Sequence, residues 1–179
     1  MNNQTNANEQ IGTGKNLEIL MKMLASINGV NRVKARKSLV ALGKPAVLSL
    51  TKALQNSELD QVRWEAAKTL GAICDTSAVP SLVDALEDKD PDVAWLAAEA
   101  LIKFKMAAWP TLLNMLIKRG SDSVSLRQGA HHIFRNQKEN GFNDLLRTLI
   151  KTLGLESRVV QESTEIAAYN ILKRIKLVP

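Results

Sequence analysis

The sequence has few of the residues that β-sheets, disulfide scaffolds and membrane proteins use. Only 4% of its 179 residues are aromatic, and the single cysteine is Cys74. One cysteine cannot form a disulfide framework or a cysteine-based zinc site, so we expect a reducing, cytoplasmic location. No apolar run approaches the roughly 18 residues that a membrane span needs, and the N-terminal residues do not resemble a signal peptide. These absences predict one soluble domain without membrane contact.

The residues that are abundant favour packed helices. Hydrophobic residues make up 45% of the chain and are mostly Leu, Ala, Val and Ile. The net charge is +6, divided into +5 over residues 1–59, −4 over residues 60–107 and +5 over residues 108–179. A nucleic-acid binder usually has a continuous basic stripe, which the acidic middle interrupts in the sequence. The charge therefore gives only slight support to an anionic partner.

The chain repeats itself at an interval of 31 residues. Val62, Val93 and Val124 have this spacing, and residues 32–39 fit residues 63–70 at the same offset. Within each unit the apolar residues recur at helical spacing, and Asp60 and Asp90 are predicted N-caps. We predict helices over residues 17–28, 31–42, 45–55, 60–73, 78–87, 91–105, 110–119, 123–137, 142–152 and 157–175. Residues 1–16 show no period and are predicted to form a disordered tail, which leaves 17–179 as a single domain.

One motif of the repeat resembles a known family. It reads Val-Arg-x-x-Ala-Ala-x-x-Leu-Gly, then Asp, then Ala-Val-Pro, and it extends from Val62 to Pro80. This run resembles the HEAT-like repeats first described in phycobilisome lyases. The resemblance implies an all-α fold, an α-solenoid of about five stacked helix pairs. In the family the Arg ties adjacent repeats together; it is present as Arg63 and Arg32, whereas Ala94 and Ser125 replace it in the later repeats.

The same resemblance implies a binding groove. In the family, the helix with the Val-Arg motif lines the concave surface, and the positions after Arg and after Ala-Ala point into it. Carried over, the candidate groove residues are Lys34, Lys37, Trp64, Glu65, Lys68, Trp95, Leu96, Glu99, Leu126 and Arg127, with Glu162 and Ser163 following in the last segment. Trp64 and Trp95 should stand side by side and form an apolar strip with Leu96 and Leu126. The alternative is that both Trp side chains fold down and pack against neighbouring helices.

Other candidate sites are weaker. His131 and His132 are adjacent on a helix, so they point about 100° apart and cannot share one metal ion. Cys74 is expected to be a buried, inert thiol. Trp109 precedes Pro110 at a predicted helix start and is expected to pack as a staple. We therefore predict no catalytic residue, no metal and no cofactor.

Three functions compete. The leading hypothesis is a non-catalytic interaction module or scaffold that binds a protein or peptide in the groove, because stacked repeats form extended binding surfaces. The second is a HEAT-type nucleic-acid binder or alkylbase DNA glycosylase, which would need Glu65 or Glu99 as its carboxylate. The third is a phycobilin lyase or chaperone-like subunit. Self-association through the Trp–Leu strip is also open.

Overall fold

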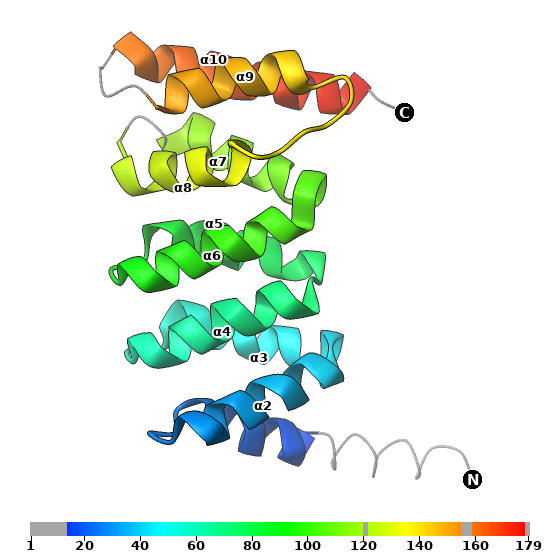
Figure 1. Cartoon of the computed structure of the whole chain (residues 1–179), viewed down its shortest axis with the longest axis vertical. Coiled ribbons are helices and arrows are strands. Elements are labelled where there is room, and N and C mark those ends of the chain that lie inside the picture. Colours follow the sequence, from blue (N-terminus) through cyan, green and yellow to red (C-terminus); the bar gives the residue numbers. More distant parts are fainter. Residues whose placement is uncertain (1–13, 120–121, 155–158, 178–179) are drawn as a thin grey trace, which may run out of the picture.

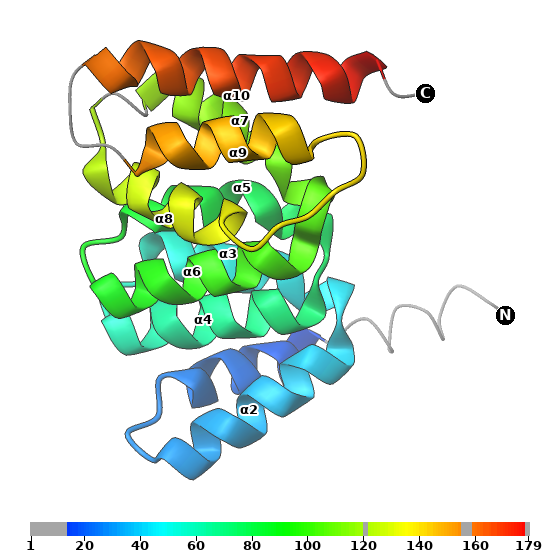
Figure 2. The ribbon, with the colours of Figure 1, turned by 45° about the horizontal axis from the view of Figure 1, so that its top comes forward.

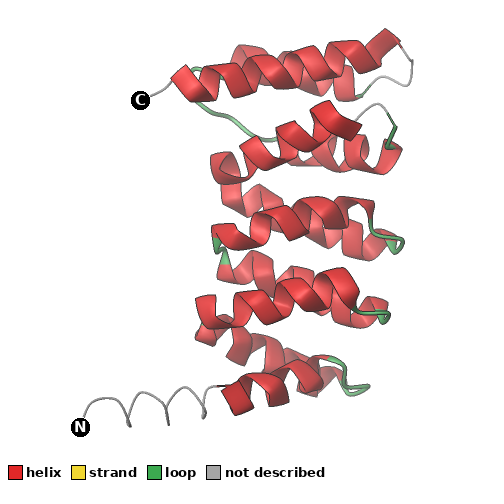
Figure 3. Ribbon diagram, turned by 180° about the vertical axis from the view of Figure 1, so that it is seen from behind, coloured by secondary structure: helices red, strands yellow, loops and turns green. Residues whose placement is uncertain are grey.

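The helices form two stacked layers. The computed structural model describes residues 14–119, 122–154 and 159–177, and these contain helices and loops but no strand (Figure 3). One layer consists of α2 (Gly29–Leu42), α4 (Asp60–Ile73), α6 (Pro91–Phe104), α8 (Val124–Phe134) and α9 (Asn143–Leu153) (Figure 1). The other consists of α3 (Lys44–Asn56), α5 (Val79–Asp84), α7 (Trp109–Arg119) and α10 (Val159–Leu177). Buried Leu and Ala side chains from both layers form one continuous core. The predicted all-α solenoid is confirmed.

The predicted helix ranges agree with the structure with two exceptions. The first described helical segment covers residues 14–24 rather than 17–28, so residues 14–16 are helical and do not belong to the predicted tail. The rest of that tail, residues 1–13, lies outside the described residues. The helix predicted over 78–87 is a short α-helix, α5, between the 3-10 turns η1 (Thr76–Ala78) and η2 (Ala85–Glu87). Such turns are common at helix ends, where they satisfy free carbonyls.

The helix starts reveal the true register of the repeat. The N-cap residues are Asn28, Leu59, Asp90 and Ser123, with intervals of 31, 31 and 33 residues. Asp60 is therefore not the N-cap that the sequence predicted but the first residue of α4. Buried residues follow the same register, because Val93 and Ala97 of α6 correspond to Leu126 and Ala130 of α8. The constant interval of 31 was wrong for α8.

The last helix pair departs from the regular order. In the preceding units the chain alternates between the layers, so α9 would be expected beside α7 and α10 beside α8. Instead α9 packs on α8, and α10 packs on both α7 and α9 (Figure 2). Glu162 and Ser163 therefore lie on a helix of the opposite layer, and their predicted place in the groove was wrong.

Two residues take roles that the sequence did not predict. Gly71 lies within α4 at its contact with α6, where a Cβ would be 2.6 Å from the Cβ of Ala100. Cys74 ends α4 in the left-handed conformation, with φ 57°, and is exposed rather than buried. Glycine thus permits close helix packing, and the helix is closed by a cysteine in a conformation that glycine usually adopts.

One helical stretch of the described residues is long and apolar enough to cross a membrane by length and composition. It covers Pro91–Arg119, and 44% of its most apolar window is buried inside the molecule. The stretch consists of α6, the 3-10 turn η3 (Lys105–Ala108) and α7, and the first and last of these lie in different layers. Lys105 has a φ of 50°, which marks the break between them. The stretch is a core helix pair of the solenoid.

Candidate binding face

The helices α2, α4, α6 and α8 present one outward surface, which we call the binding face. Three hollows open along it: one at α2 and α4, one between α6 and α8, and one at α8 beside Trp95 and the end of α9. With the register of 31, 31 and 33 residues, the outward position after each motif Arg is occupied by Val33, Trp64, Trp95 and Gln128. Trp64 and Trp95 therefore occupy equivalent positions on neighbouring helices, as the sequence predicted.

The two tryptophans differ in exposure. Trp64 is half-buried and packs against the core, and the Lys68 ammonium lies 4.4 Å from the centre of its ring. Trp95 is 53% exposed. The alternative that Trp side chains fold down thus describes Trp64 better, whereas Trp95 is a large aromatic surface held out to solvent from an ordered helix.

The Trp95 ring is supported by His132. The two ring centres are 4.1 Å apart, and His132 Nε2 lies 2.6 Å from Oε1 of Glu99. Glu99 and His132 occupy equivalent positions of α6 and α8 in the 33-residue register. The interval of 31 placed Ala130 in that position, so sequence reasoning missed His132 as a residue of the face. Ser123, whose side chain caps α8 in the structure, is the sequence signal that could have given the right register.

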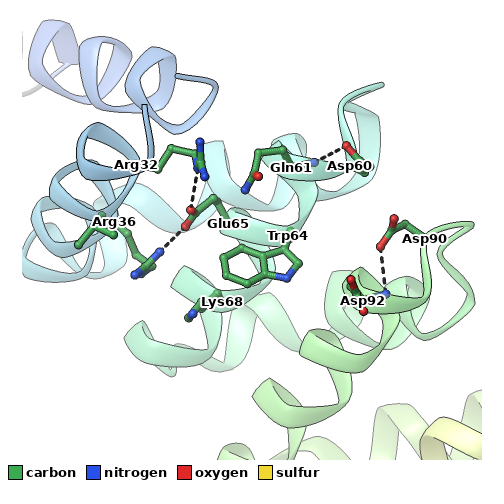
Figure 4. A pocket seen from close by; sticks show the side chains of 11 residues that line it. Arg32, Arg36, Asp60, Gln61, Trp64, Glu65, Lys68, Asp90 and Asp92 are labelled. Atoms are coloured by element: carbon green, nitrogen blue, oxygen red, sulfur yellow. Dashed lines mark hydrogen bonds and ion pairs between the residues drawn. The ribbon is translucent and has the colours of Figure 1, made fainter. Parts of the chain in front are cut away.

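Glu65 is not an open groove residue. Its side chain is buried, and its two carboxylate oxygens face Arg36 Nη1 at 2.5 Å and Arg32 Nε at 3.4 Å (Figure 4). Burial of a carboxylate is tolerated here because two guanidinium groups pair with it. Arg36 is a second residue of the face that the sequence analysis did not identify. It occupies the position at which the next repeats have the second Ala of the motif, Ala67 and Ala98.

The predicted apolar strip is interrupted. Leu126 is fully buried, because in the corrected register it corresponds to the core residue Val93. Leu96 is half-buried and packs against the core, whereas Lys34 and Lys37 are exposed, as predicted. Arg127 is half-buried at the position of the motif Arg. The face thus has one prominent aromatic side chain, Trp95, rather than a continuous strip.

Arg63 shows how the motif ties repeats together. Its Nε and Nη2 atoms donate to the two oxygens of Asp88 at 2.8 and 2.9 Å, and Nη1 donates to the carbonyls of Ser57 and Glu58. The hydrogen bond to Asp88 raises the pKa of Arg63 above its usual value, so the guanidinium stays charged although it is buried. Arg32 donates likewise to the carbonyls of Ser26 and Ile27.

The motif arginine is missing from only one of the two later repeats, so the predicted loss was right for α6 and wrong for α8. Ala94 stands at the position of Arg63, whereas Ser125 does not, because in the corrected register the motif position of α8 is Arg127. At this end of the molecule Arg119 pairs with Glu87 at 3.0 Å, and Arg174 joins α10 to Asp144 of α9 at 2.7 Å. Trp109 is fully buried between the edges of Phe134 and Phe142, so its expected packing role is confirmed.

The acidic side chains predicted for the face have partners within the molecule. Glu65 and Glu99, the carboxylates that a glycosylase would need on this face, are engaged by Arg32, Arg36 and His132. Among the residues that the structure describes, no group of three or more His, Cys, Asp or Glu side chains is placed to hold a metal ion.

Comparisons with known proteins match part of the chain to a family and its fold to a solved structure. Residues 47–133 match the sequence model of the family HEAT repeats. A similar solved structure is the complex of CpcE and CpcF of phycocyanin lyase from Nostoc sp. PCC7120, with a TM-score of 0.55 and 21% identity over 84% of this chain and 96% of that chain. At this identity the likeness concerns the fold. No curated protein matches the sequence. The described residues therefore form an α-solenoid, and residues 47–133 of it match HEAT repeats.

Proposed function

We propose that this chain is a non-catalytic binding subunit that holds another protein against its binding face. The observation that supports this most directly is Trp95, which is 53% exposed and is held in place by the His132 ring. Binding hot spots are enriched in Trp and Arg, and such a side chain fixed in place before binding loses little conformational entropy. The hollows on both sides of Trp95 offer space for partner side chains.

The test is capture of a partner from a lysate of the source cells by immobilised full-length chain. Wild type is compared with Trp95→Ala and with the double variant Trp64→Ala/Trp95→Ala, with nuclease added to a parallel sample. We expect a nuclease-resistant protein that wild type retains and that Trp95→Ala binds at least about 30-fold more weakly, since Trp hot spots are worth about 2 kcal/mol or more.

A matched control is Lys52→Glu, an exposed substitution on α3 in the opposite layer. It should leave capture unchanged. Equal recovery by wild type and both Trp variants would refute the proposed face. Loss of the captured material on nuclease treatment would favour the nucleic-acid function instead.

The second candidate is a subunit of a two-chain lyase or a related chaperone. It is supported by the solved relative, which is a chain from a complex of CpcE and CpcF of phycocyanin lyase and is matched over 96% of its length. This candidate shares the protein-binding role and adds a bilin ligand. Titration with a bilin, followed by its visible absorbance, tests whether the chain binds this ligand. Saturable binding would support a lyase-type subunit, and unchanged spectra would support a binding subunit that takes no bilin.

A further inference from the structure

Trp95 and His132 form a ridge between two hollows. The two rings, which contact each other at a tilt of 41°, line both the hollow between α6 and α8, of about 390 Å³, and the hollow at α8 and the end of α9, of about 550 Å³. Gln128 also lines both. A ligand lying across the ridge therefore meets two different environments in succession.

The first environment is mainly apolar and results from a missing arginine. Ala94 stands where Arg63 of the preceding repeat fills the space between two loops, and the neighbouring lining residues Ala98 and Gly129 are also small. Two charged groups line this hollow as well, Asp88 and Lys89. Asp88 is engaged by Arg63, and Lys89 lies 3.8 Å from Glu58. What is left open is a space for one bulky apolar side chain.

The second environment is basic. Its ionisable lining residues are Arg127, His131, His132 and Arg135, and its lining includes no carboxylate among the described residues. Glu99, which lies next to the ridge, is held by His132. Arginine is the side chain best suited to pair with a carboxylate, because its guanidinium can form two parallel hydrogen bonds. An anionic group is the ligand whose charge complements this hollow.

We propose that the ridge binds a segment of a partner protein in which a large apolar side chain lies close to an Asp or Glu. The apolar side chain occupies the hollow at Ala94, the carboxylate enters the hollow at Arg135, and the backbone crosses Trp95. This inference rests on the proposed function, because it assumes that the occupant is a protein, and it specifies the chemistry of that occupant.

The experiment is a selection of short random peptides on the immobilised full-length chain, followed by affinity measurement on the selected peptides. We expect selected sequences to contain Phe, Leu, Ile or Trp within about two residues of Asp or Glu, since alternate side chains of an extended peptide are spaced by two residues. Replacing the acidic residue by Lys, or the apolar residue by Ala, should weaken a selected peptide by about tenfold or more.

Two variants of the chain test the two hollows independently. Ser125 is an exposed lining residue of the apolar hollow, so Ser125→Leu should fill it, and Arg135→Glu should reverse the charge of the basic one. Each should weaken binding by about tenfold or more, and Arg135→Glu should partly restore binding of the Lys-substituted peptide. Arg135→Gln serves as a milder variant if the charge reversal lowers stability. Lys52→Leu and Lys52→Glu on α3 are matched controls and should change affinity by less than about twofold.

The outcomes distinguish this inference from the proposed function. Selected peptides that are basic, or apolar without an acidic residue, would overturn the inference. The inference would also be overturned if Trp95→Ala abolishes partner binding while Ser125→Leu and Arg135→Glu leave it unchanged. That result would still support the proposed function as a binding subunit. Concentration-dependent dimerisation that Ser125→Leu abolishes would identify a second copy of the chain as the occupant and refute the peptide. Failure of Trp95→Ala to affect any partner would refute both.

Discussion

At the scale of single residues, Arg63 forms a buried clamp that should contribute to stability. The guanidinium joins Asp88 to the carbonyls of Ser57 and Glu58 and is only 4% exposed. We predict that Arg63→Met lowers the free energy of unfolding by about 3–5 kcal/mol. The substitution leaves the largely buried Asp88 carboxylate without its cation, with only the Asp90 N–H as a donor, and two carbonyl oxygens without the arginine. Urea denaturation followed by circular dichroism measures this loss.

The neighbouring pair of Lys89 and Glu58 supplies the control. Its side chains are 71% and 94% exposed, and the charged atoms are 3.8 Å apart. Lys89→Met should therefore change the free energy of unfolding by less than about 1 kcal/mol. If the two variants were equally stable, the clamp would not be what holds these repeats together.

A second residue-scale prediction concerns acid. The hydrogen bonds from Arg174 hold the pKa of the Asp144 carboxyl below its usual value. The contribution of this pair to stability is therefore complete above the ordinary pKa of an aspartate and is lost as the pH falls through the lower, folded-state pKa. We expect NMR titration of the Asp144 carboxyl to show a depressed pKa in wild type and a near-normal one in Arg174→Met. An unchanged titration curve would contradict the pairing.

At the scale of helices, local signals in the sequence predicted most of the fold. Apolar spacing and prolines located nearly every helix, because these signals act within one or two turns. Two features were not predictable from them. One extra residue between α6 and the end of α7, and another in the loop before α8, lengthen the interval from 31 to 33 residues. The exchange of α9 and α10 between layers depends on long-range packing, which no local pattern records.

The candidate site shows the same division. Trp64 and Trp95 could be placed on equivalent helix positions from their spacing alone. The exposure of the two Trp rings could not be predicted, because it depends on which side chains pack against each ring. Lys68, on the same helix, lies over the Trp64 ring, whereas the Trp95 ring is contacted by His132 of α8. The wrong register predicted Leu126 on the surface and did not place His132 on the binding face.

The contact between α4 and α6 allows a prediction at this scale. A Cβ added to Gly71 would lie 2.6 Å from the Cβ and 2.9 Å from the Cα of Ala100. Gly71→Ala should improve helix propensity by about 1 kcal/mol but cost about 1–3 kcal/mol in overpacking, so we expect a net loss of stability. In the double variant Gly71→Ala/Ala100→Gly the clash between Cβ atoms disappears, and part of the loss should be recovered. A stabilised single variant would show that the helices separate without cost.

At the scale of the whole molecule, a solenoid is held together by contacts between neighbouring repeats only, so a core defect should be felt locally. Trp109 of α7 is the largest fully buried side chain, and its ring meets Phe134 at the end of α8 and Phe142 at the start of α9. Trp109→Ala should cost about 3–5 kcal/mol. Hydrogen exchange should then accelerate in α7, α8, α9 and α10, while the amides of α2 and α3 keep their protection.

The matched variant for this prediction is Trp109→Phe. It keeps an aromatic ring against Phe134 and Phe142 and removes an indole N–H that is buried without a hydrogen-bond partner in the described structure. Because losing an unsatisfied donor offsets part of the lost packing, Trp109→Phe should be clearly milder than Trp109→Ala. If Trp109→Ala accelerated exchange equally in α2 and α10, the molecule would unfold as one cooperative unit. Local unfolding at one end of the binding face could then not help it to adapt to a partner, because the other end would unfold with it.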